Sequence, residues 1–272
     1  MFTTFAHLPH SSPMNRITKL FQEKTNNVLN IYFTAGFPKL NDTVTVLEAL
    51  QEAGADIAEI GMPYSDPIAD GETIQQSNQV ALDNGMSLKV LFEQLSGMRA
   101  KISMPIILMG YINPVLQFGI EAFCEQCQAV GVDGVILPDL PMDEFYEDYK
   151  PIFDKYSILN IFLITPQTTE DRIRRIDEIS DGFIYMVSSA SVTGGTSGIT
   201  DVMETYFNRV NAMNLRNPRL IGFGIKDNAT FTKASQYAAG AIIGSQFIRV
   251  LENTNDTVKN NVVNYIKSVK GE

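Results

Sequence analysis

Short apolar segments alternate with amphipathic segments along almost the whole chain, and this alternation most constrains the fold. Eight segments are rich in β-branched and aromatic residues and read as nearly continuous apolar runs. Such runs are typical of strands that are buried on both faces, which implies a parallel sheet with crossover helices. The eight predicted strands occupy residues 28–37, 56–63, 105–111, 134–140, 160–166, 183–190, 219–225 and 239–245.

Segments with helical spacing lie between the predicted strands. Eight strand–helix units in about 250 residues predict a closed (β/α)8 TIM barrel, an α/β fold, here with an extra N-terminal helix. An open, doubly wound sheet is the alternative. It usually places a G-x-G-x-x-G loop after its first strand, whereas the segment TAGFPKL contains none. The predicted helices occupy residues 17–24, 42–54, 87–98, 120–131, 170–180, 201–213 and 255–269.

No linker or low-complexity tract divides the chain, so residues 14–272 are predicted to form a single barrel domain. Residues 1–13 precede a more natural start at Met14 and are expected to be a disordered extension. They contain both histidines of the chain, His7 and His10. The folded body therefore lacks histidine, which excludes Ser–His–Asp and Cys–His chemistry and histidine-ligated metals. A general acid or base must then be a carboxylate, a tyrosine or a lysine.

Composition excludes several further classes of protein. The net charge of -10, with no basic stretch, argues against nucleic-acid binding. No apolar run reaches the roughly 18 residues that span a membrane, and the N-terminus does not have the pattern of a secretory signal. We therefore expect a cytoplasmic protein. Cys124 and Cys127 form a C-x-x-C pair without a second pair or a nearby histidine, which favours reduced cysteines and no metal site.

The densest group of polar residues lies at 58–71, in the second predicted strand and the loop that follows it. Active sites of TIM barrels lie at this end of the strands. Glu59 stands inside the apolar strand, where a carboxylate is costly to ionise, so its pKa should be raised. The structural alternative is an ion pair, but no predicted strand contains a lysine or arginine before Arg219. Glu59 is therefore predicted to act as an acid and base.

Two aspartates follow Glu59 in the loop. Asp66 precedes Pro67, and turn chemistry explains it nearly as well as function does. Asp70 precedes Gly71 and a helical segment, so it could instead cap that helix. Together with Glu59, however, Asp70 forms a pair of carboxylates in different environments, which is the arrangement used for acid and base catalysis.

Glycine-rich turns follow the last three predicted strands, at residues 191–198, 222–224 and 244–245. Backbone N–H groups at such turns can approach an anion closely, and Ser245 opens a helical segment whose N-terminus favours negative charge. We predict a phosphate site here, as is usual late in this fold. Residues 189–198 are rich in serine, threonine and glycine, which suggests a lid, the alternative being a merely flexible loop.

These residues also match a known family. The segment E-I-G-M-P-Y-S-D-P-I-A-D-G resembles the hallmark segment of tryptophan synthase alpha subunits, and the similarity continues through YFTAGFP, GVDGVILPDLP, YMVSSASVTGG, GFGI and GS. It covers nearly the whole chain after Met14. The resemblance implies a lyase that splits indole-3-glycerol phosphate into indole and glyceraldehyde 3-phosphate by acid/base retro-aldol chemistry, in L-tryptophan biosynthesis.

The resemblance also implies roles for single residues. Glu59 matches the principal acid/base carboxylate of the family, and Asp70 matches its partner, which faces the indole nitrogen. Thr193 matches the lid threonine, whereas Ser189 and Ser191 depart from the pattern of many relatives, as does Met109, where leucine is common. The positions that match substrate-binding residues are Tyr32, Met109, Tyr185, Thr193, Gly194, Phe223, Gly224, Gly244 and Ser245.

The resemblance further implies a partner. A beta subunit would use the released indole in an alpha2beta2 tetramer, and Pro63, Asp66 and Asp139 are expected at the interface. Pyridoxal phosphate would belong to that beta subunit, so no cofactor is expected in this chain. Two alternatives remain open from the residues alone. One is another phosphate-sugar barrel, either an isomerase or a magnesium enzyme that uses Glu59, Asp66, Asp70 and Asp139. The other is a non-catalytic barrel that only activates a partner.

Overall fold

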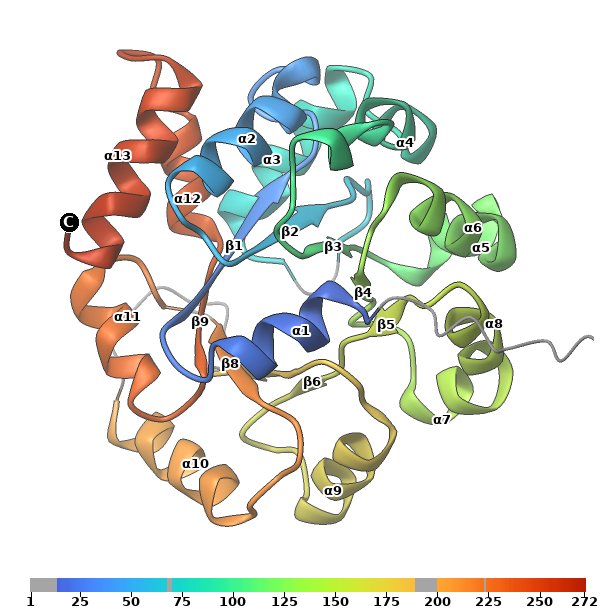
Figure 1. The fold of residues 1–272 in the computed structure, drawn as a ribbon, viewed down its shortest axis with the longest axis vertical. Coiled ribbons are helices and arrows are strands. Elements are labelled where there is room, and N and C mark those ends of the chain that lie inside the picture. Colours follow the sequence, from blue (N-terminus) through green and yellow to red (C-terminus); the bar gives the residue numbers. More distant parts are fainter. Residues whose placement is uncertain (1–13, 68–69, 189–199, 223) are drawn as a thin grey trace, which may run out of the picture.

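The strands of the chain form one parallel sheet that curls around a common axis (Figure 1). The computed structural model describes residues 14–67, 70–188, 200–222 and 224–272, so the proposed extension at 1–13 lies outside it. Neighbouring strands follow the order β5-β4-β3-β2-β1-β9-β8-β7-β6. Their bounds are β1 Val28–Thr34, β2 Ile57–Gly61, β3 Ile106–Met109, β4 Gly134–Ile136, β5 Leu159–Asn160, β6 Leu163–Ile164, β7 Ile184–Val187, β8 Arg219–Gly222 and β9 Gly240–Ile243.

The strands β5 and β6 are two halves of the single strand predicted at 160–166. The first half pairs with β4 and the second with β7. Between them, Ile161 N donates to the Val135 carbonyl and Tyr185 N donates to the Phe162 carbonyl, both at 2.9 Å. This segment therefore joins the two edges of the sheet, and the sheet closes with eight strand positions. The barrel prediction is confirmed, while the division of the fifth strand was not predicted.

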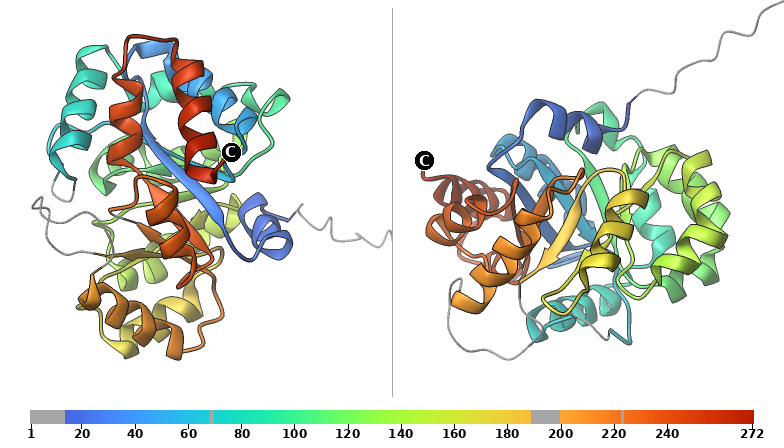
Figure 2. Two further views of the ribbon diagram at one scale, coloured as in Figure 1. Left: turned by 90° about the vertical axis from the view of Figure 1, so that its left-hand side faces the viewer. Right: turned by 90° about the horizontal axis from the view of Figure 1, so that it is seen from below.

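Helices surround the barrel, as the side views show (Figure 2). All seven predicted helical segments are helical, and several begin at side-chain caps: the hydroxyl oxygens of Ser87, Thr169 and Thr257 each accept from a backbone N–H in the first turn. The α-helices are α1 Arg16–Glu23, α2 Thr43–Glu52, α3 Glu72–Asp83, α4 Leu88–Leu95, α5 Ile112–Phe118, α6 Ile120–Val130, α7 Met142–Glu144, α8 Lys150–Lys155, α9 Glu170–Ile179, α10 Asp201–Ala212, α11 Asn228–Ser235, α12 Ser245–Leu251 and α13 Val258–Lys270. Short helical turns are η1 Leu40–Asp42, η2 Met98–Ala100 and η3 Phe145–Tyr149.

Apolar side chains form two cores, one inside the barrel and one between the sheet and the outer helices. Because side chains alternate along a strand, every second residue faces the interior. Val28 on β1 and Ile57 on β2 belong to the interior core. Asn30 and Tyr32, and likewise Glu59, therefore face the interior too. The alternation of side chains along β2 alone therefore places the carboxylate of Glu59 at the centre of the barrel.

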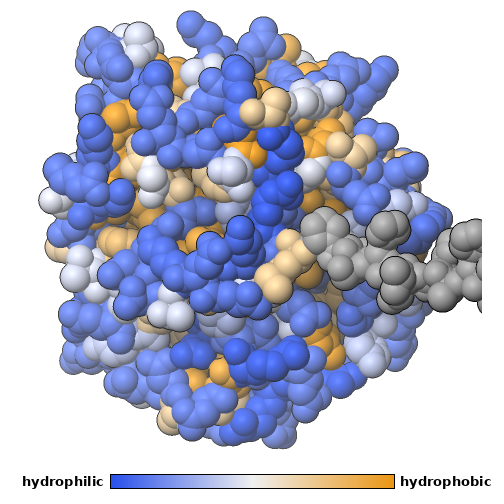
Figure 3. Space-filling view, viewed as in Figure 1, coloured by the Kyte–Doolittle hydropathy of each residue, from blue (hydrophilic) through white to orange (hydrophobic). Residues whose placement is uncertain are grey.

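Helix α1 closes the end of the barrel at which the strands begin (Figure 1). Ile17 is fully buried in the interior core, and Asn15 Nδ2 donates to the Asp133 carbonyl at 2.8 Å. Hydrophilic side chains cover most of the face that carries α1 (Figure 3). The opposite end, where the strands finish, is left for the loops that hold the predicted site.

Two further expectations concern membrane-spanning helices and the two cysteines. Within the described ranges, no helix is both long enough and apolar enough to cross a membrane. Cys124 and Cys127 lie buried in α6 as free thiols, and burial raises the pKa of Cys124 to about 12. A thiol with so high a pKa is unreactive at neutral pH, so the interpretation as ordinary core cysteines is confirmed.

Candidate active site

Glu59 lies at the centre of β2, opposite Tyr32 of β1 and Ile107 of β3, and is fully buried. Asn30 Nδ2 donates a hydrogen bond to Glu59 Oε1, while Glu59 Oε2 has no partner in the described part of the chain. Burial raises the pKa of Glu59 to about 8, and the bond from Asn30 opposes that rise. Within the described ranges Glu59 forms no ion pair with lysine or arginine, so the structural alternative for Glu59 is wrong.

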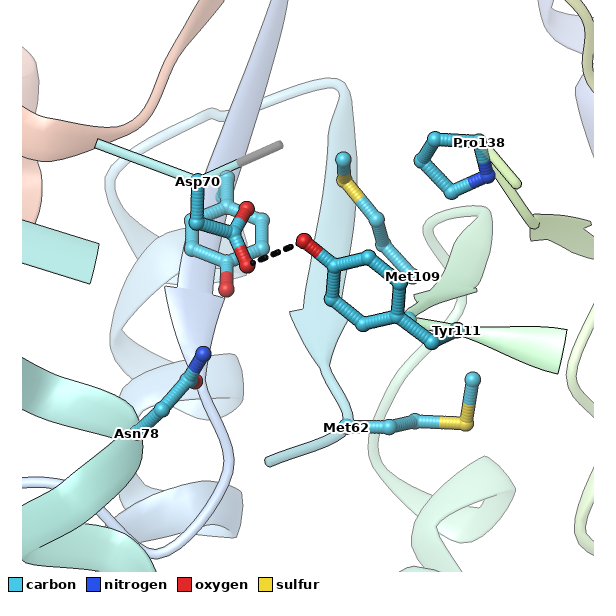
Figure 4. Close-up of a pocket in the computed structure, with 8 residues that line it drawn as sticks. Met62, Asp70, Asn78, Met109, Tyr111 and Pro138 are labelled. Atoms are coloured by element: carbon cyan, nitrogen blue, oxygen red, sulfur yellow. Dashed lines mark hydrogen bonds between the residues drawn. The ribbon is translucent and has the colours of Figure 1, made fainter. Parts of the chain in front are cut away.

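Asp70 stands just before α3, but it does not cap that helix. The cap residue is Gly71, which makes no side-chain capping bond. The side chain of Asp70 turns instead to Tyr111, whose hydroxyl donates to Asp70 Oδ2 at 3.0 Å (Figure 4). Burial raises the pKa of Asp70 above its usual value, and the bond from Tyr111 opposes this rise. The two carboxylates therefore occupy different environments, as the sequence predicted.

A small pocket lies beside Asp70, where β1 to β4 end (Figure 4). Its walls are mostly apolar or aromatic, and among the described residues that line it Asp70 is the one with a carboxyl group. Such walls suit a flat apolar ring, and a carboxylate at the edge suits a ring N–H group. The residues that line it are Tyr32, Met62, Asp70, Asn78, Met109, Gly110, Tyr111 and Pro138.

Two tyrosines cross the interior close to Glu59. A Cβ atom at Gly61 would collide with the hydroxyl of Tyr32, and one at Gly222 would collide with the hydroxyl of Tyr185. Because Gly61 and Gly222 have no side chain, there is space for the phenol rings of Tyr32 and Tyr185. Burial raises the pKa of both tyrosines well above the usual value, and the nearby carboxylates Glu59 and Asp70 raise it further. Both phenols are therefore neutral and can donate hydrogen bonds.

Three residues of the predicted phosphate site lie in the described part of the chain. Gly224 has φ of 75°, a left-handed conformation that favours glycine, and no heavy atom of the described residues lies within 4 Å of a Cβ added there. Gly244 follows β9 and lies next to Tyr32, whose Cβ would lie 3.7 Å from an added Cβ. Ser245 begins α12, as predicted. Thr193, Gly194, Phe223 and the predicted lid at 189–198, with Ser189 and Ser191, lie outside the described residues.

The three residues expected at a partner interface differ in exposure. Asp66 is exposed and accepts from Ser65 Oγ at 2.5 Å, whereas Pro63 and Asp139 are half-buried. Asp139 Oδ1 accepts from Ile112 N at 2.9 Å and so holds the first turn of α5. In the ranges that are described, no three acidic, cysteine or histidine side chains are arranged to hold a metal ion.

Sequence reasoning missed two residues that contact the carboxylates, Asn30 and Tyr111. Asn30 stands in the first predicted strand, two residues before Tyr32, and Tyr111 ends the third. Each is a polar side chain in an apolar run. Alternate residues of each strand face the interior of the barrel. A search for polar residues at these interior positions would therefore have found Asn30 in addition to Glu59.

Comparisons with known proteins show the family and agree with the fold. The profile of the family described as "Tryptophan synthase alpha chain" matches residues 18–271. The tryptophan synthase alpha chain of Flavobacterium johnsoniae is 55% identical over 241 residues, which are 89% of this chain and 95% of the relative. The crystal structure of tryptophan synthase subunit alpha from Legionella pneumophila superposes with a TM-score of 0.85 at 28% identity, covering 95% of this chain and 98% of the other. A chain of the tryptophan synthase complex from Pyrococcus furiosus gives 0.83 at 31% identity, covering 92% and 100%.

Proposed function

This chain belongs to the tryptophan synthase alpha chain family and is an indole-3-glycerol phosphate lyase of tryptophan biosynthesis, and we propose that Glu59 and Asp70 carry its chemistry. The proposal rests on the burial of Glu59 and on the raised pKa of its carboxyl group. Glu59 is fully buried, has one carboxyl oxygen without a partner in the described part of the chain, and has a pKa of about 8. At neutral pH it is therefore mostly protonated and can deliver a proton.

The cleavage begins with proton transfer from Glu59 to carbon 3 of the indole ring. The ring then carries a positive charge centred on its nitrogen, which the carboxylate of Asp70 stabilises. Glu59, now ionised, removes the proton of the hydroxyl on the adjacent side-chain carbon. The carbon–carbon bond breaks as the aldehyde forms, and its electrons return to the ring. Indole leaves as a neutral molecule, and Glu59 has regained its proton.

Tyr32, Met109 and Tyr185 are proposed to enclose the indole ring. Tyr32 and Met109 line the pocket beside Asp70, and Tyr185 lies close to Glu59. A site enclosed by such side chains excludes water, which strengthens the electrostatic effect of Asp70 on the developing charge.

The phosphate group is proposed to bind late in the barrel, at Gly194, Phe223, Gly224, Gly244 and Ser245. The turns at 191–198, 222–224 and 244–245 contain no lysine or arginine, so backbone N–H groups would supply the binding. Gly224→Asp places a carboxylate where this anion should lie, and aspartate tolerates the left-handed conformation better than most residues. Substrate binding should fail in this variant while its circular dichroism stays native. Unchanged binding would place the phosphate elsewhere.

The partner is proposed to be a beta subunit in an alpha2beta2 tetramer, with Pro63, Asp66 and Asp139 at the interface. That subunit would carry pyridoxal phosphate, and this chain would need no cofactor. Both subunits would work in the cytoplasm, where a phosphorylated substrate is retained. Thr193 would close over the substrate when the partner binds, a gating role that suits a segment rich in small polar residues.

Indole release from indole-3-glycerol phosphate tests these assignments. The isolated chain should release indole slowly and the complex with saturating beta subunit much faster, and Thr193→Val should weaken that activation more than it weakens phosphate binding. Equal rates with and without the partner would exclude the coupling. A loss of activity upon addition of a chelator would favour the magnesium alternative, and no indole release at all would favour the non-catalytic one.

A further inference from the structure

Asn30 is an unusual residue for the centre of a barrel strand. It lies in β1, faces the interior and is fully buried. Its Nδ2 donates to Glu59 Oε1, but its own Oδ1 has no partner in the described part of the chain. Burying an amide oxygen without a partner costs stability, and asparagine is disfavoured in strands. Stability alone therefore does not explain an asparagine at this position.

The bond from Asn30 has a chemical consequence for Glu59. A protonated carboxyl group has one carbonyl oxygen, which accepts hydrogen bonds well, and one hydroxyl oxygen, which donates. Asn30 Nδ2 is a donor, so it favours Oε1 as the carbonyl oxygen. The proton is then held on Oε2, which is the oxygen without a partner.

We propose that Asn30 is a positioning residue, which selects Oε2 of Glu59 as the atom that carries the transferable proton and stabilises the carboxylate that remains after transfer. This inference rests on the proposed role of Glu59 as the proton donor. Once Glu59 has lost its proton, the bond from Asn30 becomes charge-assisted and therefore stronger. Asn30 thus favours the product of the proton transfer over its starting state.

The groups that face Glu59 from other elements do not replace Asn30. Tyr32 on β1 and Tyr185 on β7 lie close to Glu59, but in the described part of the chain neither is hydrogen-bonded to its carboxyl group, and Ile107 on β3 is apolar. Asp70, beyond the end of β2, is acidic and would oppose a negative charge on Glu59. Asn30 is the polar group that favours ionisation, since its bond lowers the pKa of Glu59 while burial raises it.

The test compares four variants in the complex with the beta subunit. Asn30→Leu removes the donor at similar volume, and Asn30→Ser keeps a shorter donor. Asn160→Leu is the matched control. Asn160 is also a buried strand asparagine whose Oδ1 has no partner among the described residues, but it lies on β5 and faces the outer helices, because its neighbour Ile161 belongs to the interior core. Glu59→Gln reports on the proposed function itself. For each variant, kcat and KM for indole release are measured between about pH 6 and 10.

Asn30→Leu should lower kcat at least about tenfold with little change in KM, because a bond to the developing charge is lost. The fall in kcat/KM at alkaline pH should move up by about one pH unit, because the group that lowered the pKa of Glu59 is gone. Asn30→Ser should recover part of both effects, and Asn160→Leu should match the wild type. A merely structural role for Asn30 would not move the pH profile.

The outcomes separate the two proposals. If Glu59→Gln is inactive while Asn30→Leu has the wild-type kcat and pH profile, the role of Asn30 is overturned and that of Glu59 stands. If Glu59→Gln keeps its activity, the proposed function fails. If Asn30→Leu does not fold, the Glu59 carboxyl is titrated by infrared difference spectroscopy in Asn30→Ser, with Glu59→Gln as the reference. A titration at higher pH than in the wild type supports the role of Asn30, and an unchanged titration overturns it.

Discussion

Two buried carboxylates of the barrel, one where the strands begin and one in the middle of β2, differ in their partners. Asp133, just before β4, has a side chain that is only 3% exposed. It accepts from Arg16 at 2.8 Å, Arg99 at 2.6 Å and the backbone N–H of Ile106 at 2.8 Å. Glu59, fully buried in β2, accepts from one neutral amide, and its second oxygen has no partner in the described ranges.

The difference shows how burial can serve either structure or chemistry. A buried carboxylate with two guanidinium partners and an N–H donor has its oxygens satisfied and connects segments that are far apart in the sequence. Arg16 belongs to α1 and Arg99 to η2, so Asp133 ties both to the start of the sheet. A buried carboxylate without a cation is instead held neutral and becomes a proton donor, at a cost in stability.

Replacement of Glu59 by glutamine should give the largest effect on catalysis. Glutamine keeps the shape but cannot titrate, so turnover should fall by about 100-fold or more, the usual scale for a positioned acid or base. The free energy of unfolding should stay the same or rise, because a buried ionisable group is removed. Indole release and urea unfolding measure the two quantities. A variant that makes indole at a near-normal rate would refute the assignment.

Replacement of Asp133 by asparagine should have the converse effect. The free energy of unfolding should fall by about 2–4 kcal/mol, because Arg99 loses its carboxylate partner in a largely buried position. Arg16 contributes less, since its side chain is 43% exposed. At a temperature where the variant is folded, kcat should match the wild type. A loss of activity without a loss of stability would contradict the division of roles between Asp133 and Glu59.

Replacement of Tyr111 by phenylalanine should give the smallest effect. The variant loses the hydroxyl that donates to Asp70 Oδ2 and that opposes the rise in the pKa of Asp70. We expect kcat/KM to fall up to about tenfold. Asp70→Asn sets the upper limit for this fall in kcat/KM, because it removes the carboxylate itself. It should be a second severe lesion, although less complete than Glu59→Gln. A Tyr111→Phe variant as impaired as Asp70→Asn would mean that Tyr111 acts on the substrate directly.

The sequence predicted the barrel and the burial of Glu59 because both depend on local patterns. Eight apolar runs specify eight strands, and a carboxylate within a run has to be buried. The break of the fifth strand into β5 and β6 has no such signature in residues 160–166. Contacts between residues far apart were also not predicted: Arg16 meets Asp133 across 117 positions, and Tyr111 meets Asp70 across 41. Such pairs depend on strand register and loop path, which no local pattern specifies.

The cap role considered for Asp70 shows the same limit. Its position before Gly71 fits a helix N-cap as well as it fits a catalytic aspartate. Only the direction of the side chain distinguishes the two, and that direction depends on Tyr111 at the end of a different strand. A local pattern can therefore name candidates for a site, while the three-dimensional contacts decide between their roles.

The most direct test of the central claim, that Glu59 is uncharged in the folded protein, is the pH dependence of stability. Folding raises the pKa of Glu59 from 4.5 to about 8, so between these values the folded protein holds a proton that the unfolded chain releases. The wild type should therefore lose stability as the pH rises through this window, by up to about 1.4 kcal/mol per pH unit from this group, and the loss should stop above it. Glu59→Gln lacks this contribution.

Urea unfolding of both proteins between about pH 5 and 9 makes the comparison. The account predicts that the stability advantage of Glu59→Gln over the wild type widens as the pH rises toward 8 and then levels off. A difference that stays constant across the whole range would show that Glu59 is already ionised in the folded protein, which would contradict its role as the stored proton donor.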